Sequence, residues 1–421
     1  MGSNPGPVKL KCAYQMYEWG KIGERSAVAQ FAQSDSSFQL QKDKPYAELW
    51  MGTHPNGPSQ VLDSHSSEAQ SLLEWINSHN GCLGSKVSDI FGDKLPFLFK
   101  VLSVNKALSI QAHPNKEHAE KLHASRPDVY KDPNHKPEMA IAITEYEGLC
   151  GFRPISEIKE YLENVAEFAA IIGDAASSLI QSSDDAQAKV GLKKCFTALM
   201  TTPSDSVKKL LNSLVSKIKA MKEKGQDSSP YLGDLIMRLN SQFPGDVGCF
   251  CAYFLNHVVL QPGEAMFLGP NLPHAYLSGD CMECMACSDN VVRAGLTPKY
   301  KDVETLCEML EYKPSTASDN IFQPHKDPSD PYITVYDPPV KDFSVMKIQV
   351  PFSNTVSSYK LKPLNGPSIL IVISGSATLK SSGDAMGLGR GNVIFIPASS
   401  QVSLEFEKEE LLMFRAYCDP Q

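Results

Sequence analysis

The spacing of hydrophobic residues along the chain changes at Pro154 and again at Cys249. Before Pro154, short apolar or alternating runs are separated by clusters of Gly, Pro, Asn and Asp, a pattern that predicts strands joined by turns. Predicted strands lie at Val28–Ala32, Ala47–Gly52 and Pro96–Val104, and a helix is expected near Glu68–Ser78. The N-terminal part of the chain is therefore expected to be mainly β.

From Pro154 to about Ser241 the apolar residues recur every three or four positions, which predicts amphipathic helices. Strand patterns return at Cys249–Leu260, and one further helix is expected at Val303–Leu310. The helices between Pro154 and Ser241 therefore form a unit that is inserted into a β protein.

The stretch Ser315–Pro339 is rich in Pro and Asp and is expected to connect two domains. Strands are predicted again beyond it, at Ser344–Val350, Ser368–Gly375 and Asn392–Ala398. We therefore expect three domains: residues 1–153 together with 247–320, a helical insertion at 154–246, and a C-terminal domain at 321–421. The first and last of these domains are expected to share one β architecture.

Charge and composition narrow the function classes. The chain has 421 residues with 40 Lys and Arg against 48 Asp and Glu, a net charge of −8, and no dense basic run. This balance argues against nucleic-acid binding but allows a local basic pocket. No apolar run reaches the roughly 18 residues of a membrane helix, and the N-terminal segment lacks a signal-peptide pattern. The 11 cysteines are scattered, so we expect a cytoplasmic protein without a disulfide framework.

Four polar residues on predicted strands have the chemistry of a metal site. Side chains at alternate positions share one face of a strand, so Ser109, Gln111 and His113 are expected to project together. Glu138 opens another predicted strand, and His274 follows a Gly- and Pro-rich turn. Two imidazoles, a carboxylate and an amide oxygen suit Zn²⁺ or another divalent transition metal. The alternative is a pair of hydrogen-bonded strand histidines without a metal.

This order of residues resembles the pattern of cupins, small jelly-roll β barrels that hold a metal at their mouth. Two features depart from the usual cupin pattern: Gln111 replaces the first His, and about 25 residues separate His113 from Glu138. Residues Gly375–Leu404 resemble the second half of a cupin. Ser399, Ser400 and Gln401 stand there in place of a ligand His, so no metal is expected in the C-terminal domain.

Longer motifs resemble one family, the type I phosphomannose isomerases. The motifs lie at Lys44–Pro55, Pro96–Lys116, Asn134–Ile143, Gly148–Pro154 and Pro273–Lys299. The resemblance implies a mainly β fold with a cupin-like jelly-roll catalytic domain, an inserted α-helical domain and a second, degenerate C-terminal cupin-like domain. It also implies a zinc-dependent aldose–ketose isomerase that interconverts mannose 6-phosphate and fructose 6-phosphate through a cis-enediol. Such an enzyme supplies mannose 6-phosphate for GDP-mannose and glycosylation.

The resemblance also implies residue roles. It implies one Zn²⁺ per chain, held by Gln111, His113, Glu138 and His274, and places the essential arginine at Arg293. A fixed guanidinium stabilises developing negative charge without losing its own proton.

The proton carrier is not settled by the motifs. Lys136, His135, Glu48 and Glu283 are candidates; we rank Lys136 first because it lies two positions before Glu138, and Glu283 second. A lysine base would need a pKa lowered by burial or by a cation nearby.

Residues for substrate binding are expected near the metal strands. Lys100, Ser109 and Lys299 are predicted donors to the phosphate, and Tyr276, with Trp19, is predicted to line the sugar pocket. The alternatives are exposed surface lysines and core aromatic residues. The expected partner is a small sugar phosphate, bound by a monomer.

Other interpretations stay open. Cys281, Cys284 and Cys287 have the spacing that begins an iron–sulfur motif, although buried strand thiols are the expected outcome. Two other functions would use a cupin site: an Fe²⁺ dioxygenase, which a two-His, one-carboxylate set also suits, and a non-catalytic sugar-binding bicupin. The intact ligand set together with Arg293 favours the isomerase.

Overall fold

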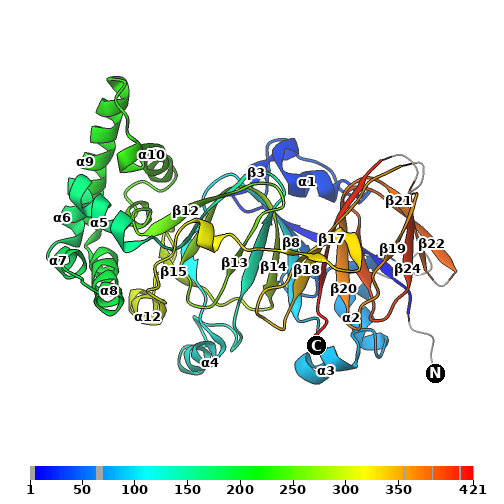
Figure 1. Cartoon of the computed structure of the whole chain (residues 1–421). Helices are drawn as coiled ribbons and strands as arrows, with labels where there is room; N and C mark the ends of the chain where they lie inside the picture. Colours follow the sequence, from blue (N-terminus) through cyan, green and yellow to red (C-terminus); the bar gives the residue numbers. More distant parts are fainter. Residues whose placement is uncertain (1–4, 63–69, 354–356, 382, 407–408, 421) are drawn as a thin grey trace.

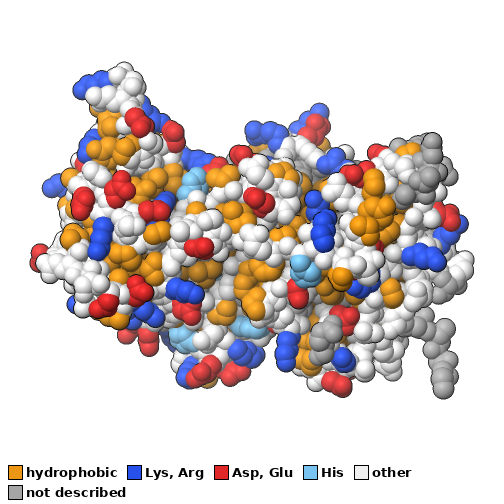
Figure 2. Space-filling model, in the orientation of Figure 1, with side chains coloured by type: hydrophobic (Ala, Val, Ile, Leu, Met, Phe, Trp, Pro, Cys, Tyr) orange, Lys and Arg blue, Asp and Glu red, His pale blue; other side chains and the backbone are white. Residues whose placement is uncertain are grey.

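The computed structural model describes residues 5–62, 70–353, 357–381, 383–406 and 409–420. Helices gather at one end of the molecule, a large sheet occupies the middle, and a second β region forms the other end (Figure 1). Acidic and basic side chains are interspersed over the face shown in Figure 2. Within the described ranges, none of the helices combines the length and the apolar character that crossing a membrane requires.

The middle of the molecule is built around one long strand, β14 (His274–Ala286). Its antiparallel neighbours are β8 (Phe97–Val104), β9 (Ile110–Ala112), β10 (Glu138–Ala142) and β11 (Tyr146–Phe152). In the described chain they belong to a 10-stranded sheet. Its other strands are β2 (Ala13–Gln15), β5 (Glu48–Met51), β12 (Leu255–Leu260), β13 (Ala265–Leu268) and β15 (Val292–Gly295).

The C-terminal region contains two further sheets. Over the described residues, the larger has nine strands in the order β16-β17-β18-β25-β20-β23-β1-β6-β7, and the smaller has four in the order β19-β24-β21-β22. The bounds of the larger sheet are His325–Asp327, Asp330–Tyr336, Ser344–Val350, Leu411–Tyr417, Ser368–Ser374, Val393–Ile396, Val8–Lys11, Gln60–Leu62 and Gln70–Ser71. Those of the smaller are Ser358–Leu361, Val402–Glu405, Ala377–Ser381 and Asp384–Leu388. Because β1 pairs with both β6 and β23, strands from the N-terminal part of the chain complete the C-terminal sheet.

The alternation of side chains along each strand separates two faces of the central sheet. On β8, Phe97, Phe99 and Val101 join a core that also contains Ile371 and Phe414 of the C-terminal sheet. The opposite face carries small and polar residues, including Ala140, Ala142 and Tyr276. One face is therefore buried against the second β region, and the other is the face on which the candidate site lies.

Helices cover the remaining surfaces. The predicted helical unit contains α5 (Ile155–Asn164), α6 (Ala166–Ile172), α7 (Ala175–Ile180), α8 (Asp185–Thr201), α9 (Ser204–Glu223) and α10 (Gly233–Gln242). Its core continues into the central region through Phe152 and Leu296. Shorter helices are α2 (Leu72–Ser78), α3 (Ser85–Phe91), α4 (Lys116–Ser125) and α12 (Val303–Met309), which confirms the helix expected at Val303–Leu310. Residues Glu68 and Ala69 of the helix expected at Glu68–Ser78 lie outside the described residues.

Three predicted segments differ from the structure. Val28–Ala32 is helical, in α1 (Ala27–Ala32), because the Ser26 side chain accepts a hydrogen bond from the Ala29 N–H and caps the helix. Cys249–Leu260 begins with a short helix, α11 (Gly248–Cys251), before β12. Ser315–Pro339 is not only a connection, because it contains the edge strand β16 and its neighbour β17. A buried apolar run alone does not distinguish a short helix from a strand.

Candidate metal centre

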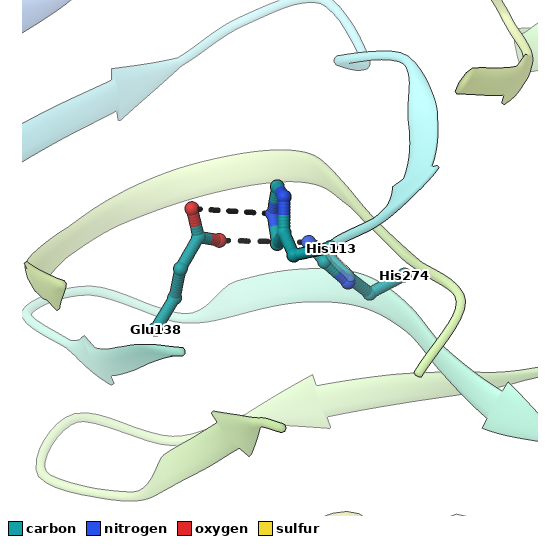
Figure 3. A group of neighbouring side chains, drawn as sticks. All are labelled: His113, Glu138 and His274. Carbon is teal, nitrogen blue, oxygen red and sulfur yellow. Dashed lines mark ion pairs between the residues drawn. The ribbon is translucent and has the colours of Figure 1, made fainter. Parts of the chain in front are cut away.

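His113, Glu138 and His274 form a buried cluster on the polar face of the central sheet. One potential ligand atom from each lies within 4.8 Å of the others, and each residue is at most 2% exposed. His113 follows β9, Glu138 opens β10 and His274 opens β14. The Glu138 carboxylate faces both imidazole rings (Figure 3). The three predicted residues, which are distant in the sequence, therefore come together.

The hydrogen bonds of the two rings leave one nitrogen of each available. Nδ1 of His113 donates to the backbone carbonyl of Asn290 at 2.7 Å, and Nδ1 of His274 donates to that of Leu272 at 2.9 Å. The two Nε2 atoms lie 3.4 and 3.5 Å from Glu138 oxygens, and neither has a hydrogen-bond partner among the described residues. Burial lowers the pKa of His113 to about 4, so its Nε2 is an unprotonated donor. One imidazole nitrogen from each histidine, facing the same carboxylate, fits a divalent metal.

Glu138 is ionised in this setting. Burial alone would raise its pKa, but the positive charge of Lys136, whose Nζ lies 3.1 Å from Glu138 Oε1, holds the pKa well below its ordinary value. Lys136 lies two positions before the start of β10, and its side chain is 12% exposed. The carboxylate is thus able to act as an anionic ligand, and an ammonium group lies directly beside it.

Gln111 lies on the strand next to His274, and Arg293 lies on the strand beyond it. Gln111 on β9 is paired in register with His274 on one side and with Arg293 on the other. The Arg293 guanidinium is half-buried and has no hydrogen bond or ion pair with any described residue. Burial without a counter-charge lowers the pKa of Arg293, although an arginine stays protonated. This unpaired cation is available for an anionic ligand.

A second polar cluster lies beside the first. Lys100 Nζ is 3.3 Å from Glu48 and 3.1 Å from Glu283, and all three side chains are buried. The Tyr276 hydroxyl donates to Glu283 at 2.9 Å and lies 3.5 Å from Glu138, which links the two clusters. Burial raises the pKa of Glu283. Lys100 is in contact with both carboxylates, so its ammonium is already paired.

The other predicted residues lie in several places. Ser109 lies directly before β9 and is half-buried, and Lys299 follows β15 and is exposed. Trp19 is partly buried and packs against the cluster that contains Ala140 and Tyr276. His135 points to Asp342 of the C-terminal region, with its Nε2 3.1 Å from that carboxylate. The contact between His135 and Asp342 was not indicated by any motif.

The cysteines do not form a metal site. Cys281 and Cys284 are buried on opposite faces of β14, since they belong to different cores. Residues three apart on a strand point in opposite directions, so the iron–sulfur interpretation of Cys281, Cys284 and Cys287 is wrong. All three thiols are free.

Sequence reasoning missed one residue that shapes the centre, Asn290. Its backbone carbonyl accepts the His113 hydrogen bond, and its side chain is buried. Every residue carries a carbonyl, so no pattern of residue types could have identified it.

Comparisons with known proteins agree with this geometry. Models of the type I phosphomannose isomerase family match residues 8–155 (catalytic domain), 170–255 (helical insertion domain) and 335–384 (C-terminal domain). Mannose-6-phosphate isomerase of Bos taurus is 54% identical over 97% of this chain and 98% of its own length; that of Homo sapiens is 52% identical over 98% and 99%. A solved mannose 6-phosphate isomerase bound with zinc and yttrium is 31% identical, with a TM-score of 0.83 over 99% of this chain and 100% of its own.

Proposed function

Because the chain belongs to the type I phosphomannose isomerase family, we propose that it interconverts mannose 6-phosphate and fructose 6-phosphate through a cis-enediol, using one Zn²⁺ per chain. The observation that carries the proposal is the buried cluster of His113, Glu138 and His274, in which both Nε2 atoms lack a hydrogen-bond partner among the described residues. Gln111 is proposed as the fourth ligand, because it lies beside His274 in register and alternates with Ala112 onto the face of His113.

The reaction moves a proton from C2 to C1 of the open-chain sugar, and negative charge develops on the oxygens of both carbons. Bound Zn²⁺ would act as a Lewis acid toward these oxygens. Arg293 is proposed to stabilise the same charge, because its guanidinium is unpaired and lies on the strand next to Gln111. It keeps its proton throughout the cycle.

Lys136 is the first proposed proton carrier and Glu283 the second. The Lys136 ammonium is next to Glu138, whereas Glu283 is in contact with Lys100 and Tyr276. A Lys136→Ala variant that keeps its zinc is expected to lose exchange of the C2 proton with solvent deuterium. Near-normal exchange and turnover in that variant would remove Lys136 from the role.

Substrate contacts are proposed at one end of the β9 and β15 pair. Ser109 precedes β9 and Lys299 follows β15, and because these strands run antiparallel both residues lie at the same end; they are proposed to hold the phosphate. Lys100 was predicted as a donor to the phosphate. Because its ammonium is already paired with Glu48 and Glu283, we propose instead that Lys100, together with Tyr276, contacts the sugar.

Several broader properties are proposed with this function. We propose three domains, at residues 1–153 with 247–320, at 154–246 and at 321–421. Strands β1 and β6 belong to the first of these in the sequence but pair within the larger C-terminal sheet. The chain is proposed to act as a monomer in the cytoplasm and to supply mannose 6-phosphate for GDP-mannose and glycosylation. Size-exclusion chromatography with light scattering tests the monomer.

A coupled assay for fructose 6-phosphate, with metal analysis of the same sample, tests the proposed function. We expect turnover of mannose 6-phosphate without oxygen, loss of turnover with a chelator and recovery with Zn²⁺. Activity that required oxygen and Fe²⁺ would instead indicate a dioxygenase. Sugar-phosphate binding without turnover at full zinc occupancy would indicate a binding protein.

A further inference from the structure

Asn290 lies in the loop between β14 and β15 and is 1% exposed. We propose that Asn290 is a positioning residue that orients the metal ligand His113 and, at the same time, fixes the segment 132–136 that carries Lys136. The inference rests on the proposed function, because it concerns how the same site is held in its working geometry.

The first half of the role belongs to the backbone of Asn290. Its carbonyl accepts the Nδ1 proton of His113 at 2.7 Å. This bond selects the tautomer in which Nε2 is the free donor, and it sets the rotation of the ring toward Glu138. Groups that orient a metal ligand in this way typically change metal affinity 10- to 100-fold when they are disturbed.

The second half belongs to the side chain. Asn290 Nδ2 donates to the backbone carbonyls of Asp132 at 2.6 Å and Asn134 at 3.0 Å. Ser288 Oγ accepts from the Asn290 N–H and donates to the Asn134 carbonyl. In the other direction, Asn134 Nδ2 donates to the Cys287 carbonyl at 3.0 Å. The loop before β15 and the segment before β10 are therefore joined by several hydrogen bonds.

The segment held in this way leads directly to the reacting groups. Lys136 comes two residues after Asn134, and Glu138 two residues after Lys136. A displacement of Asn290 would therefore disturb His113, Lys136 and Glu138 together. A side chain that only filled space would not fix the orientation of His113 and the position of Lys136 and Glu138 at the same time.

Two substitutions separate positioning from packing. Asn290→Asp keeps the size of the side chain but replaces the donor with a carboxylate oxygen, which repels the carbonyls of Asp132 and Asn134. Asn290→Ala removes the donor and leaves a small cavity. If positioning is the role, Asn290→Asp is the more damaging change; if filling space is the role, Asn290→Ala is.

The measurements are the zinc dissociation constant by chelator competition, and kcat and KM at saturating zinc. We expect zinc binding about 10- to 100-fold weaker in Asn290→Asp, less weakened in Asn290→Ala, and a lower kcat in both even with zinc restored. Ser288→Ala removes the two hydrogen bonds of the Ser288 hydroxyl but leaves those of the Asn290 side chain. It is therefore a milder test, with a smaller shift in the same direction, should Asn290→Asp not fold.

Asn256→Ala is the matched control. Asn256 is also 1% exposed, and its amide donates to four backbone carbonyls, but these lie in residues 150–152 and at Ser315. It is expected to lower thermal stability with unchanged zinc affinity. Zinc affinity in the folded Asn290→Asp and Ser288→Ala variants equal to that of the parent would overturn the inference and leave the isomerase intact. A parent chain that bound no zinc would overturn the proposed function, and the inference with it.

Discussion

The two β regions of the molecule differ in the chemistry of their interiors. On the polar face of the central sheet, His113, Glu138, His274, Lys100 and Glu283 are buried together. The interior of the C-terminal region is apolar, with residues such as Ile348, Leu370, Val372, Ile394 and Met413. The group of His113, Glu138 and His274 is the one potential metal group of the described chain.

This difference shows that the β sheets only determine where side chains are placed. Whether a metal can bind depends on which side chains occupy those places. In the C-terminal region, Ser399, Ser400 and Gln401 occupy the turn between β23 and β24 where a cupin ligand His is expected, and Ser399 has a positive φ of 60°. None of these residues offers an imidazole. That this region holds no metal stays a prediction.

The C-terminal region packs against the face of the central sheet that is opposite to the candidate site. Its larger sheet shares one core with the apolar face of the central sheet, where Phe99 and Met282 meet Ile371 and Phe414. A shared apolar core of this kind holds two regions in a fixed arrangement. Asp342 also reaches His135, next to Lys136. The second β region therefore contributes to the geometry of a site to which it gives no ligand.

The largest expected effect comes from removing a proposed ligand. His274→Ala deletes one of the two imidazole nitrogens in the cluster, so we expect loss of bound zinc and a fall in kcat/KM of about 10³-fold or more. Metal analysis and the coupled assay measure the two effects. Gln401→Ala, at the equivalent place in the C-terminal region, should change neither. Normal zinc content in His274→Ala would refute its role as a ligand.

A pair of arginines gives the next sharpest contrast. Arg293 has no partner among the described residues, whereas Arg415 is 2% exposed, with its guanidinium donating to Ser368 Oγ at 2.9 Å and to the carbonyl of Lys362. We expect Arg293→Met to lower kcat by about 10²- to 10³-fold with unchanged zinc content and melting temperature.

Arg415→Met should do the reverse. It leaves a buried hydroxyl and carbonyl without their donor, at a cost of about 1–3 kcal/mol for each group, and it does not touch the proposed site. Thermal unfolding is expected to shift to lower temperature while kcat and zinc content stay normal. If the Arg415→Met protein were fully folded at the assay temperature and still lost activity, the C-terminal region would act on the chemistry directly.

Most strands and helices of the central region and of the helical insertion were predictable from the sequence. The strands that carry Glu138 and Lys100 follow from alternation, because each has one apolar and one polar or small face. The helical insertion was predictable because its apolar residues recur every three or four positions. Val28–Ala32 was predicted wrongly because five residues are too few to show a helical period, and the helix signal lies outside the segment, in the cap at Ser26.

The site was predictable only in part. Residue types and strand faces grouped Gln111 with His113, but the convergence of Glu138 and His274 on them came from the family resemblance. Contacts that depend on the backbone, such as the Asn290 carbonyl, and on distant segments, such as Asp342 with His135, leave no pattern along the chain.

Acid stability provides a test confined to the C-terminal region. The Lys362 ammonium, 2.6 Å from Asp327, lowers the pKa of that buried carboxyl to about 2. A carboxyl with a depressed folded-state pKa stabilises the fold above the ordinary Asp pKa of about 3.9. This contribution is lost as the pH falls toward 2.

Asp327→Asn should therefore be less stable than the parent at pH 7, with the difference shrinking between about pH 4 and pH 2. Urea unfolding at a series of pH values measures this. Zinc content and kcat at pH 7 are expected to be unchanged, because Asp327 lies at the edge strand β16. A constant stability difference at every pH would contradict the role of the ion pair.

The smallest expected effect is at Lys299, which is exposed and has no ion pair with a described residue. An exposed charge contributes about 0.2–1 kcal/mol, so Lys299→Gln should raise KM for mannose 6-phosphate by about fivefold at most and leave kcat unchanged. Lys380 of the C-terminal region is half exposed and paired with Glu405 at 2.6 Å, and Lys380→Gln is the control for a general loss of one positive charge. Because salt screens exposed charges, the KM difference between the two variants should shrink as ionic strength rises. Equal KM values at low salt would mean that Lys299 makes no contact with the phosphate, and the phosphate would then be held by Arg293 or Ser109 instead.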